Sequence, residues 1–214
     1  MKSLLKDAKR VLEDWKLMPK YPVQEKMLRC LVEYYPDHNS LEGVDYKVKY
    51  LNKFYSTRIL ATNSVVNHIY RKSKQIDKGL QEGNPKVVDI IAKCNDVGRT
   101  NYSFATKYCA LHRPDQYPIY DSIVSDVFRS LREKGLLQDY LHCNKKDFES
   151  ILQDYIQYKK LYDRFMKQYG LTLLSYREVD WYLWSAYKIS DHTYEIEALA
   201  PIKREIAKVS LTKK

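Results

Sequence analysis

Residues 101–124 read NYSFATKYCALHRPDQYPIYDSIV, and this stretch decides the fold and the site that we predict. Ser103 is a suitable N-cap for a helix over residues 103–112, which would place Lys107 near the first turn. The positive end of a helix dipole, away from water, favours the neutral amine, which is the form that attacks carbon. Asp121 precedes an apolar-periodic stretch, so we expect it to cap the next helix. The segment therefore predicts either a covalent lysine catalyst with a carboxylate close by, or a solvated lysine beside a structural cap.

The rest of the chain has the pattern of an all-α protein. It contains only six glycines and seven prolines among 214 residues, and its apolar side chains recur at the helical period. A capping box from Ser175 to Glu178 opens the last predicted helix. We expect one α-helical domain over residues 1–214, with its core over 45–189 and a basic tail over 190–214. The predicted helices cover residues 3–17, 23–34, 45–55, 64–73, 85–94, 103–112, 122–134, 145–169 (with a break allowed) and 176–187.

Composition and cysteine spacing argue against several classes of protein. No apolar run approaches the roughly 18 residues that a membrane span needs, and the charged start MKSLLKDAKR lacks the apolar core of a signal peptide. We therefore expect a cytoplasmic protein that has no membrane partner. The four cysteines and five histidines are scattered, without the spacing of a zinc or iron–sulfur site. No metal and no other cofactor are expected.

The net charge of +10 is spread unevenly along the chain. Residues 51–100 carry nine basic and four acidic side chains, just before the segment that holds Lys107. A basic surface favours a polyanion, because neutralising phosphates releases counterions. The alternative is a solvated basic face with no nucleic-acid partner. The candidate phosphate contacts are Arg58, Arg71, Lys72, Gly98, Arg99 and Arg113.

Three blocks of the sequence resemble the helix–hairpin–helix DNA glycosylases, and most of all bacterial proteins of the 8-oxoguanine DNA glycosylase fold. The middle block is the most specific, and it joins Ser103-Phe-Ala-Thr-Lys107, Ala110-Leu-His-Arg-Pro114 and Tyr117-Pro-Ile-Tyr-Asp121. The flanking blocks are LNKFYSTRI at residues 51–59 and YREVDWYLW at residues 176–184. The resemblance implies a helix–hairpin–helix stack of short helices.

The resemblance also implies a function, which is base excision from DNA that carries an oxidised purine. The damaged nucleotide would be extruded from the duplex into a pocket of the enzyme. Lys107 is implied as the nucleophile that displaces the base and forms a Schiff base, which can lead to strand cleavage. Asp121 is implied as the carboxylate that stabilises the cationic sugar. The implied base pocket would draw on Tyr117, Tyr120, Asp180 and Trp184.

One departure from the family pattern leaves a second function open. The usual Gly-x-Gly is absent directly before the lysine helix, and Tyr102 and Phe104 stand nearby instead. Those glycines let a DNA phosphate approach backbone amides. The rival prediction is a non-catalytic member of the same fold that binds DNA or a protein.

Overall fold

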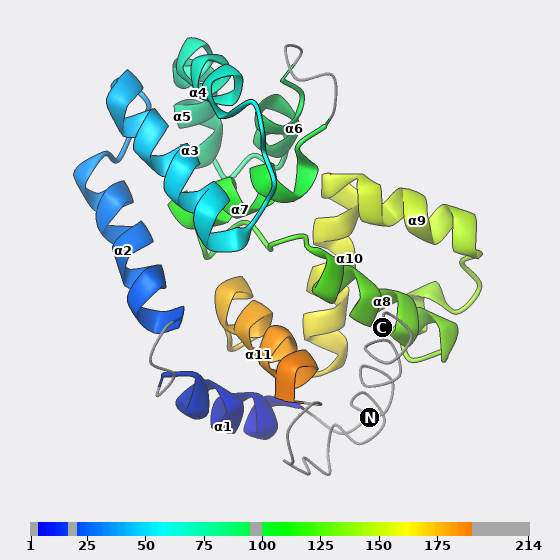
Figure 1. Cartoon of the computed structure of the whole chain (residues 1–214). Coiled ribbons are helices and arrows are strands. Elements are labelled where there is room, and N and C mark those ends of the chain that lie inside the picture. The colour runs from blue at the N-terminus through cyan, green and yellow to red at the C-terminus, as the bar shows by residue number, and fades with distance from the viewer. Residues whose placement is uncertain (1–3, 17–20, 95–99, 190–214) are drawn as a thin grey trace. The chain divides into compact units, whose positions relative to one another are not determined.

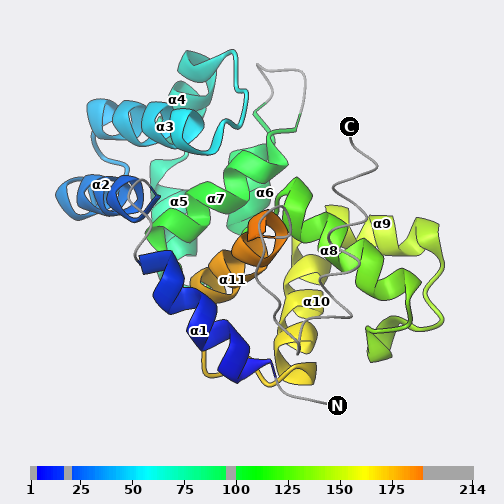
Figure 2. The same cartoon turned by 60° about the horizontal axis from the view of Figure 1, so that its bottom comes forward.

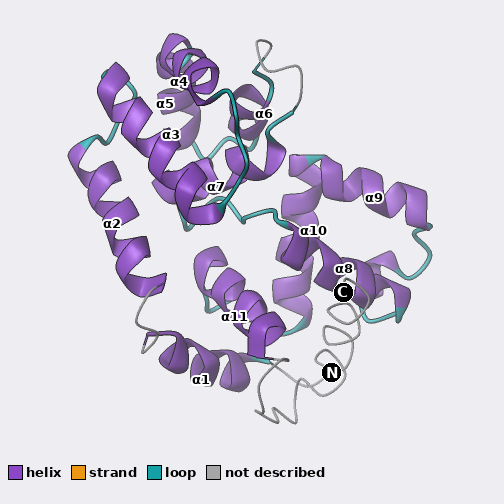
Figure 3. Cartoon of the chain, in the orientation of Figure 1, coloured by secondary structure: helices purple, strands orange, loops and turns teal. Residues whose placement is uncertain are grey.

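The computed structural model describes residues 4–16, 21–94 and 100–189, and this part of the chain forms α-helices, one short 3-10 helix and no strand (Figure 1, Figure 3). The all-α prediction is therefore confirmed for these residues. None of the helices among them is long and apolar enough to cross a membrane. The chain divides into two compact units. We call residues 18–120, which contain Lys107, the lysine unit, and residues 1–17 together with 121–214, which contain Asp121, the aspartate unit.

The lysine unit is built around α7 (Figure 2). This helix packs on α2, α3 and α6, and eight of its eleven residues are buried. Its sequence, YSFATKYCALH, is apolar on nearly every face, and a helix with that pattern belongs in a core. The helices of the unit are α2 (Tyr21–Tyr34), α3 (Leu41–Tyr55), α4 (Thr62–Arg71), α5 (Ser73–Gln81), α6 (Lys86–Ala92) and α7 (Tyr102–His112).

Helix α5 is an element that the sequence pattern did not predict. It buries Ile76 and Leu80, which lie one turn apart, and it contains Gly79. A Cβ atom at Gly79 would lie 2.1 Å from the Cγ2 atom of Val87 on α6, so the close approach of the two helices requires glycine. A glycine and so short an apolar face give a weak helix signal. Packing against α6 therefore holds a helix that local propensity does not specify.

The aspartate unit has an aromatic core. Trp15 of α1 stacks on Trp181 of α11, with ring centroids 5.5 Å apart. Phe128 of α8 meets Tyr162 of α10 edge to face, also at 5.5 Å. Such aromatic pairs add stabilisation beyond their buried area. The elements of the unit are α1 (Leu5–Lys16), α8 (Ser122–Glu133), the 3-10 helix η2 (Gln138–Tyr140), α9 (Lys145–Gln153), α10 (Tyr155–Gln168) and α11 (Tyr176–Ile189).

Two predicted helix ends agree with the structure of this unit. The long helix expected over residues 145–169 is broken at Asp154, whose side chain accepts a hydrogen bond from the Gln157 amide at 2.9 Å and so caps α10. The capping box of α11 is confirmed. The Glu178 amide donates to Ser175 Oγ at 3.2 Å, and the Ser175 amide donates to Glu178 Oε2 at 2.8 Å.

Candidate functional site

Lys107 lies inside the lysine unit, where only 5% of the residue is exposed. The alternative of a solvated lysine therefore does not describe it. The predicted N-cap is wrong, because α7 begins at Tyr102 and is flanked by Asn101, which leaves Ser103 inside the helix. Lys107 thus stands in the second turn of α7 and not in the first. The helix dipole acts mainly on the first turn, so it contributes less at Lys107 than the sequence suggested.

The amine of Lys107 has defined partners. Its Nζ atom donates to Ser103 Oγ at 2.7 Å and to the Tyr120 carbonyl oxygen at 3.3 Å. The same atom lies 5.5 Å from the ring centroid of Tyr55 on α3, within the range of a cation–π contact. These contacts hold the amine against the backbone of Tyr120, which is the residue directly before Asp121.

Three side chains of α7 converge on Tyr120, and we call Ser103, Thr106 and Lys107 the Tyr120 clasp. The Tyr120 amide donates to Thr106 Oγ1 at 3.1 Å, and Ser103 Oγ donates to the Tyr120 carbonyl oxygen at 3.1 Å. Thr106 is fully buried. Because an unpaired backbone group is costly away from water, the clasp satisfies both polar groups of Tyr120. The Thr-Lys pair of the middle block therefore fixes the chain at the end of the lysine unit.

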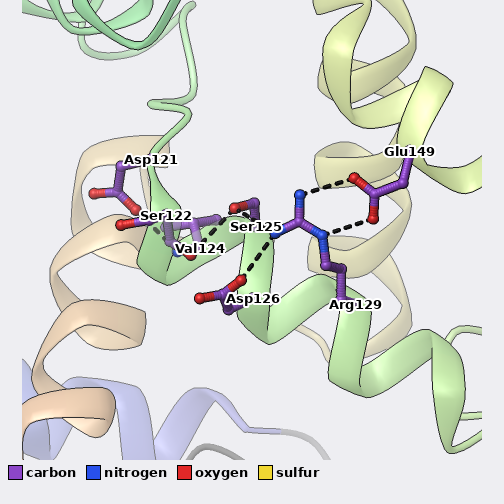
Figure 4. A network of polar contacts seen from close by, with 7 residues as sticks. All are labelled: Asp121, Ser122, Val124, Ser125, Asp126, Arg129 and Glu149. Carbon is purple, nitrogen blue, oxygen red and sulfur yellow. Dashed lines mark hydrogen bonds and ion pairs between the residues drawn. The ribbon is translucent and has the colours of Figure 1, made fainter. Parts of the chain in front are cut away.

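Asp121 caps α8, as the sequence predicted. The Val124 amide donates to Asp121 Oδ1 at 2.9 Å (Figure 4). Two turns further along, Arg129 forms a bidentate pair with Glu149 of α9, at 2.7 and 2.9 Å, and also bonds to Asp126 at 2.8 Å. Bidentate pairs have a fixed geometry. The start of α8, and with it the carboxylate of Asp121, is therefore held in place within the aspartate unit.

Two of the predicted site residues, Asp121 and Asp180, act on the same buried tyrosine. Burial raises the pKa of Tyr162 on α10 well above its usual value, and the charges of Asp180 and Asp121 raise it further. Asp180 is itself only 6% exposed and forms an ion pair with Arg177. Trp184, another predicted pocket residue, packs edge to face against Trp15 with centroids 5.5 Å apart.

The two tyrosines predicted for the base pocket have different surroundings. Tyr117 is 1% exposed, and its hydroxyl group lies 3.1 Å from each of the carbonyl oxygens of Gly79 and Asn84. Its hydroxyl group therefore joins the end of α5 to the start of α6, and its place in a base pocket stays a prediction. Tyr120 is partly exposed, with its ring centroid 4.7 Å from that of Tyr102, and it remains a candidate.

Of the six predicted phosphate contacts, three are exposed, two lie outside the described residues, and Arg113 bonds to backbone carbonyl groups. Arg58, Arg71 and Lys72 have exposed side chains on the lysine unit. Arg58 lies in the connection between α3 and α4, in the left-handed region with φ 58°. Gly98 and Arg99 lie outside the described residues.

The guanidinium group of Arg113 bonds to the backbone of α5. Its Nη1 atom lies 3.2 Å from the carbonyl oxygens of both Leu80 and Gln81, at the C-terminal end of α5. A cation in that position satisfies the last carbonyls of a helix. Arg113 therefore caps α5, and because 32% of its side chain is exposed, its contact with a phosphate stays a prediction.

Sequence reasoning missed a polar cluster in the lysine unit, centred on Lys47 of α3. This lysine is fully buried, and burial lowers its pKa to about 8 although Asp77 and Asp37 act in the opposite direction. The available signal was its helical spacing, because Lys47 stands between buried Val44 and Leu51 on the same face of α3. Within residues 4–16, 21–94 and 100–189, no group of three or more His, Cys, Asp or Glu side chains is arranged to hold a metal ion.

Comparison with known proteins identifies relatives over much of the chain. The family model HI_0787_N, described as an N-terminal domain, matches residues 7–116. A protein from Haemophilus influenzae (strain ATCC 51907 / DSM 11121 / KW20 / Rd), described as an uncharacterized protein, is 31% identical over 153 residues. That match covers 71% of this chain and 69% of the relative. No solved structure matches.

Proposed function

This chain belongs to the HI_0787_N family, and we propose that it is a DNA glycosylase with lyase activity on duplexes that carry an oxidised purine. Lys107 is the proposed nucleophile and Asp121 the proposed stabilising carboxylate. The proposed fold is the glycosylase-like helix–hairpin–helix stack, with α6 and α7 as the two helices of the motif. The proposal begins from the resemblance of the three sequence blocks and is supported by the surroundings of Lys107.

The observation that carries the proposal is that the amine of Lys107 is fixed by hydrogen bonds and shielded from water. A catalytic nucleophile has to be oriented, and it reacts better when bulk water is kept away. The Tyr120 clasp supplies the orientation through bonds of 2.7 and 3.3 Å from Nζ. The 5% exposure of the residue supplies the exclusion of water. Most lysines keep their ammonium group in water, and the burial and hydrogen bonds of the Lys107 amine support a chemical role.

The connection between α3 and α4 is a second support, because it exposes an apolar and a basic side chain. Leu60 is 91% exposed there, beside the exposed Arg58. Asn52 holds the connection, accepting from Thr57 Oγ1 at 2.7 Å and from the Ile59 amide at 3.1 Å. Apolar side chains can enter between base steps, and arginine binds phosphates. We therefore assign this connection as a DNA contact of the proposed enzyme.

The proposed chemistry uses the neutral amine of Lys107. Its nitrogen attacks the anomeric carbon, the bond to the base breaks, and the base leaves with that electron pair and takes up a proton. The sugar ring then opens, which converts the new carbon–nitrogen bond into an imine. The negative charge of Asp121 is proposed to stabilise the positive charge that develops on the sugar. Loss of a proton beside the imine expels the 3′ phosphate and cuts the strand.

Borohydride trapping tests the proposal, since reduction of the imine links protein and DNA permanently. Duplexes that carry oxidised guanine should give an adduct with the native protein and none with Lys107→Gln. Lys159→Gln is the matched control, because Lys159 is another partly buried lysine, with 25% of its side chain exposed. This variant should trap like the native protein. Failure of the native protein to form an adduct, or an equal yield from Lys107→Gln, contradicts the proposal.

A second candidate is a non-catalytic member of the same fold that binds DNA. The missing Gly-x-Gly before α7 favours it, as does an amine that already bonds to Ser103 and Tyr120. This candidate predicts DNA binding that weakens steeply with salt, no adduct, and no effect of Lys107→Gln. Gel shifts over a range of salt concentrations separate it from a protein that binds no nucleic acid.

A further inference from the structure

A cluster of five polar side chains lies inside the lysine unit and shares no residue with the Tyr120 clasp. It consists of His38, Lys47, Asp77, Tyr108 and His112, which we call the His38 cluster. His38 comes from the connection between α2 and α3, Lys47 from α3, Asp77 from α5, and the last two from α7. His38, Lys47 and Tyr108 are fully buried. The proposed glycosylase chemistry uses none of the five, so their arrangement needs another account.

Residues 35–40, which connect α2 to α3, are hydrogen-bonded to side chains of both α5 and α3. Asp77 accepts a hydrogen bond from His38 Nδ1 at 2.5 Å and another from the His38 amide at 3.3 Å. From α3, Lys47 Nζ donates to the carbonyl oxygens of Tyr35 at 3.0 Å and Asp37 at 2.7 Å. Because an ionised carboxylate can only accept, Nδ1 of His38 carries the proton, which leaves Nε2 as a lone pair in the neutral ring.

On the other side of His38 lie the rings of α7. The ring centroid of His38 is 4.8 Å from that of His112 and 5.6 Å from that of Tyr108, and the last two are 5.3 Å apart. Each ring carries a buried polar atom, namely His38 Nε2, His112 Nε2 and Tyr108 Oη. None of these atoms has a hydrogen-bond partner among the described residues. Buried polar atoms without partners are rare and mark a site of reduced stability.

A proton added to either imidazole would meet an unfavourable environment. The charged and titratable groups that face the two rings are Lys47 from α3, Asp77 from α5, Tyr108 from α7, and Asp37 from the connection itself. Of these, Asp77 already accepts the Nδ1 proton of His38. A second proton, on Nε2, would place a cation in the core near the ammonium group of Lys47.

We propose that the His38 cluster is an acid-sensitive latch, in which proton uptake by both His38 and His112 at mildly acidic pH releases residues 35–40 from α5 and α7. The sign follows from the burial of both rings. Burial lowers the pKa of His38, and it lowers the pKa of His112 well below its usual range, with the charge of Lys47 acting in the same direction. Both rings are therefore neutral when the latch is closed. An open latch lets them protonate near pH 6.5, so closure is favoured above that pH and is lost as the pH falls below it.

Hydrogen exchange at the His38 amide tests the latch, because this amide is bonded to Asp77 only when the latch is closed. After correction for the intrinsic pH dependence of exchange, the opening constant should rise below about pH 6.5, by up to tenfold per pH unit for each proton taken up. In His112→Phe, which keeps a ring but takes up no proton, the rise should be less steep. The exposed His142 provides the control, and His142→Phe should behave like the native protein. The Val124 amide, which is bonded to Asp121 in the aspartate unit, should stay protected.

Several results would overturn the latch. They are an opening constant that does not depend on pH, equal steepness in the native protein and His112→Phe, and loss of protection at Val124 together with His38. Side-chain NMR of the native protein gives an answer even where the variant fails to fold. The imidazoles of His38 and His112 should take up protons only as the protection of the His38 amide is lost. Protonation of either ring while that amide stays protected would exclude the latch.

Discussion

The Nζ atom of Lys107 donates a hydrogen bond to the carbonyl oxygen of Tyr120 at 3.3 Å. The Ser103 hydroxyl group lies between these two groups, because it accepts from Nζ at 2.7 Å and donates to the same carbonyl oxygen at 3.1 Å. Tyr120 is the last residue before Asp121. The Tyr120 clasp therefore ties a buried amine to the chain segment that leads into the capping carboxylate.

Ser103→Ala should show how much the clasp contributes. The change removes a hydroxyl group that bonds to both Lys107 and Tyr120, so we expect a loss of about 1–2 kcal/mol in the free energy of unfolding. The trapping yield should also fall, because the amine loses part of its orientation. Urea unfolding measures the first effect. Ser150→Ala is the control. The exposed Ser150 hydroxyl group donates to the Lys146 carbonyl oxygen of its own helix at 3.2 Å, so its removal should change the free energy of unfolding by less than about 0.5 kcal/mol. Equal stability of the native protein and Ser103→Ala would show that the hydroxyl group of Ser103 in the clasp does not stabilise the fold.

Lys47 should make stability rise with pH on the alkaline side. Its pKa is about 8 in the folded protein and 10.5 in the unfolded chain. Below pH 8 the lysine is charged in both states, and above pH 8 the folded state releases its proton first, which favours folding. The free energy of unfolding of the native protein, relative to that of Lys47→Met, should therefore increase by roughly 2–3 kcal/mol between pH 7 and pH 10. Urea unfolding at a series of pH values measures this difference. Parallel curves for the two proteins would mean that Lys47 keeps an ordinary pKa.

Tyr117→Phe distinguishes a structural tyrosine from a base contact. The hydroxyl group bonds to the carbonyl oxygens of Gly79 and Asn84, so its removal should lower the free energy of unfolding by about 1–2 kcal/mol. Trapping under conditions where the variant is folded should be unchanged. Tyr50→Phe is a suitable control because Tyr50 is 48% exposed, and it should be neutral in both assays. Loss of trapping with full stability would place Tyr117 in the base pocket.

Local chemistry explains what the sequence could predict. Asp121 and the Ser175–Glu178 box were assigned as caps because a short polar side chain before an apolar-periodic run satisfies free amides, whatever the rest of the fold does. The break inside residues 145–169 has the same origin, since Asp154 is an N-cap within a longer periodic stretch.

The remaining features depend on contacts between elements that lie far apart in the chain. Lys107 was weighed as a surface lysine because a single charged side chain gives no sign of the helices that cover it. Helix α5 exists because Gly79 fits against Val87, a pairing that no local pattern reports. The bond between His38 and Asp77 spans 39 residues, so their spacing carried no signal. Arg113 and Tyr117 were predicted as ligand contacts, and both satisfy backbone carbonyls near α5, a helix that was itself missed.

Two substitutions at Asp121 separate its capping role from a catalytic one. Asparagine is as good an N-cap as aspartate but carries no charge, so Asp121→Asn should keep the Val124 bond and the stability of the native protein to within about 0.5 kcal/mol. Asp121→Ala loses the cap as well and should cost about 1 kcal/mol. If the carboxylate stabilises the cationic sugar, both variants lose trapping, although only one loses stability. Asp154→Asn is the matched control, because Asp154 caps α10 in the same way and has no proposed role in the chemistry. Native trapping by Asp121→Asn would leave Asp121 as a cap alone, and the positive charge on the sugar would then need another partner.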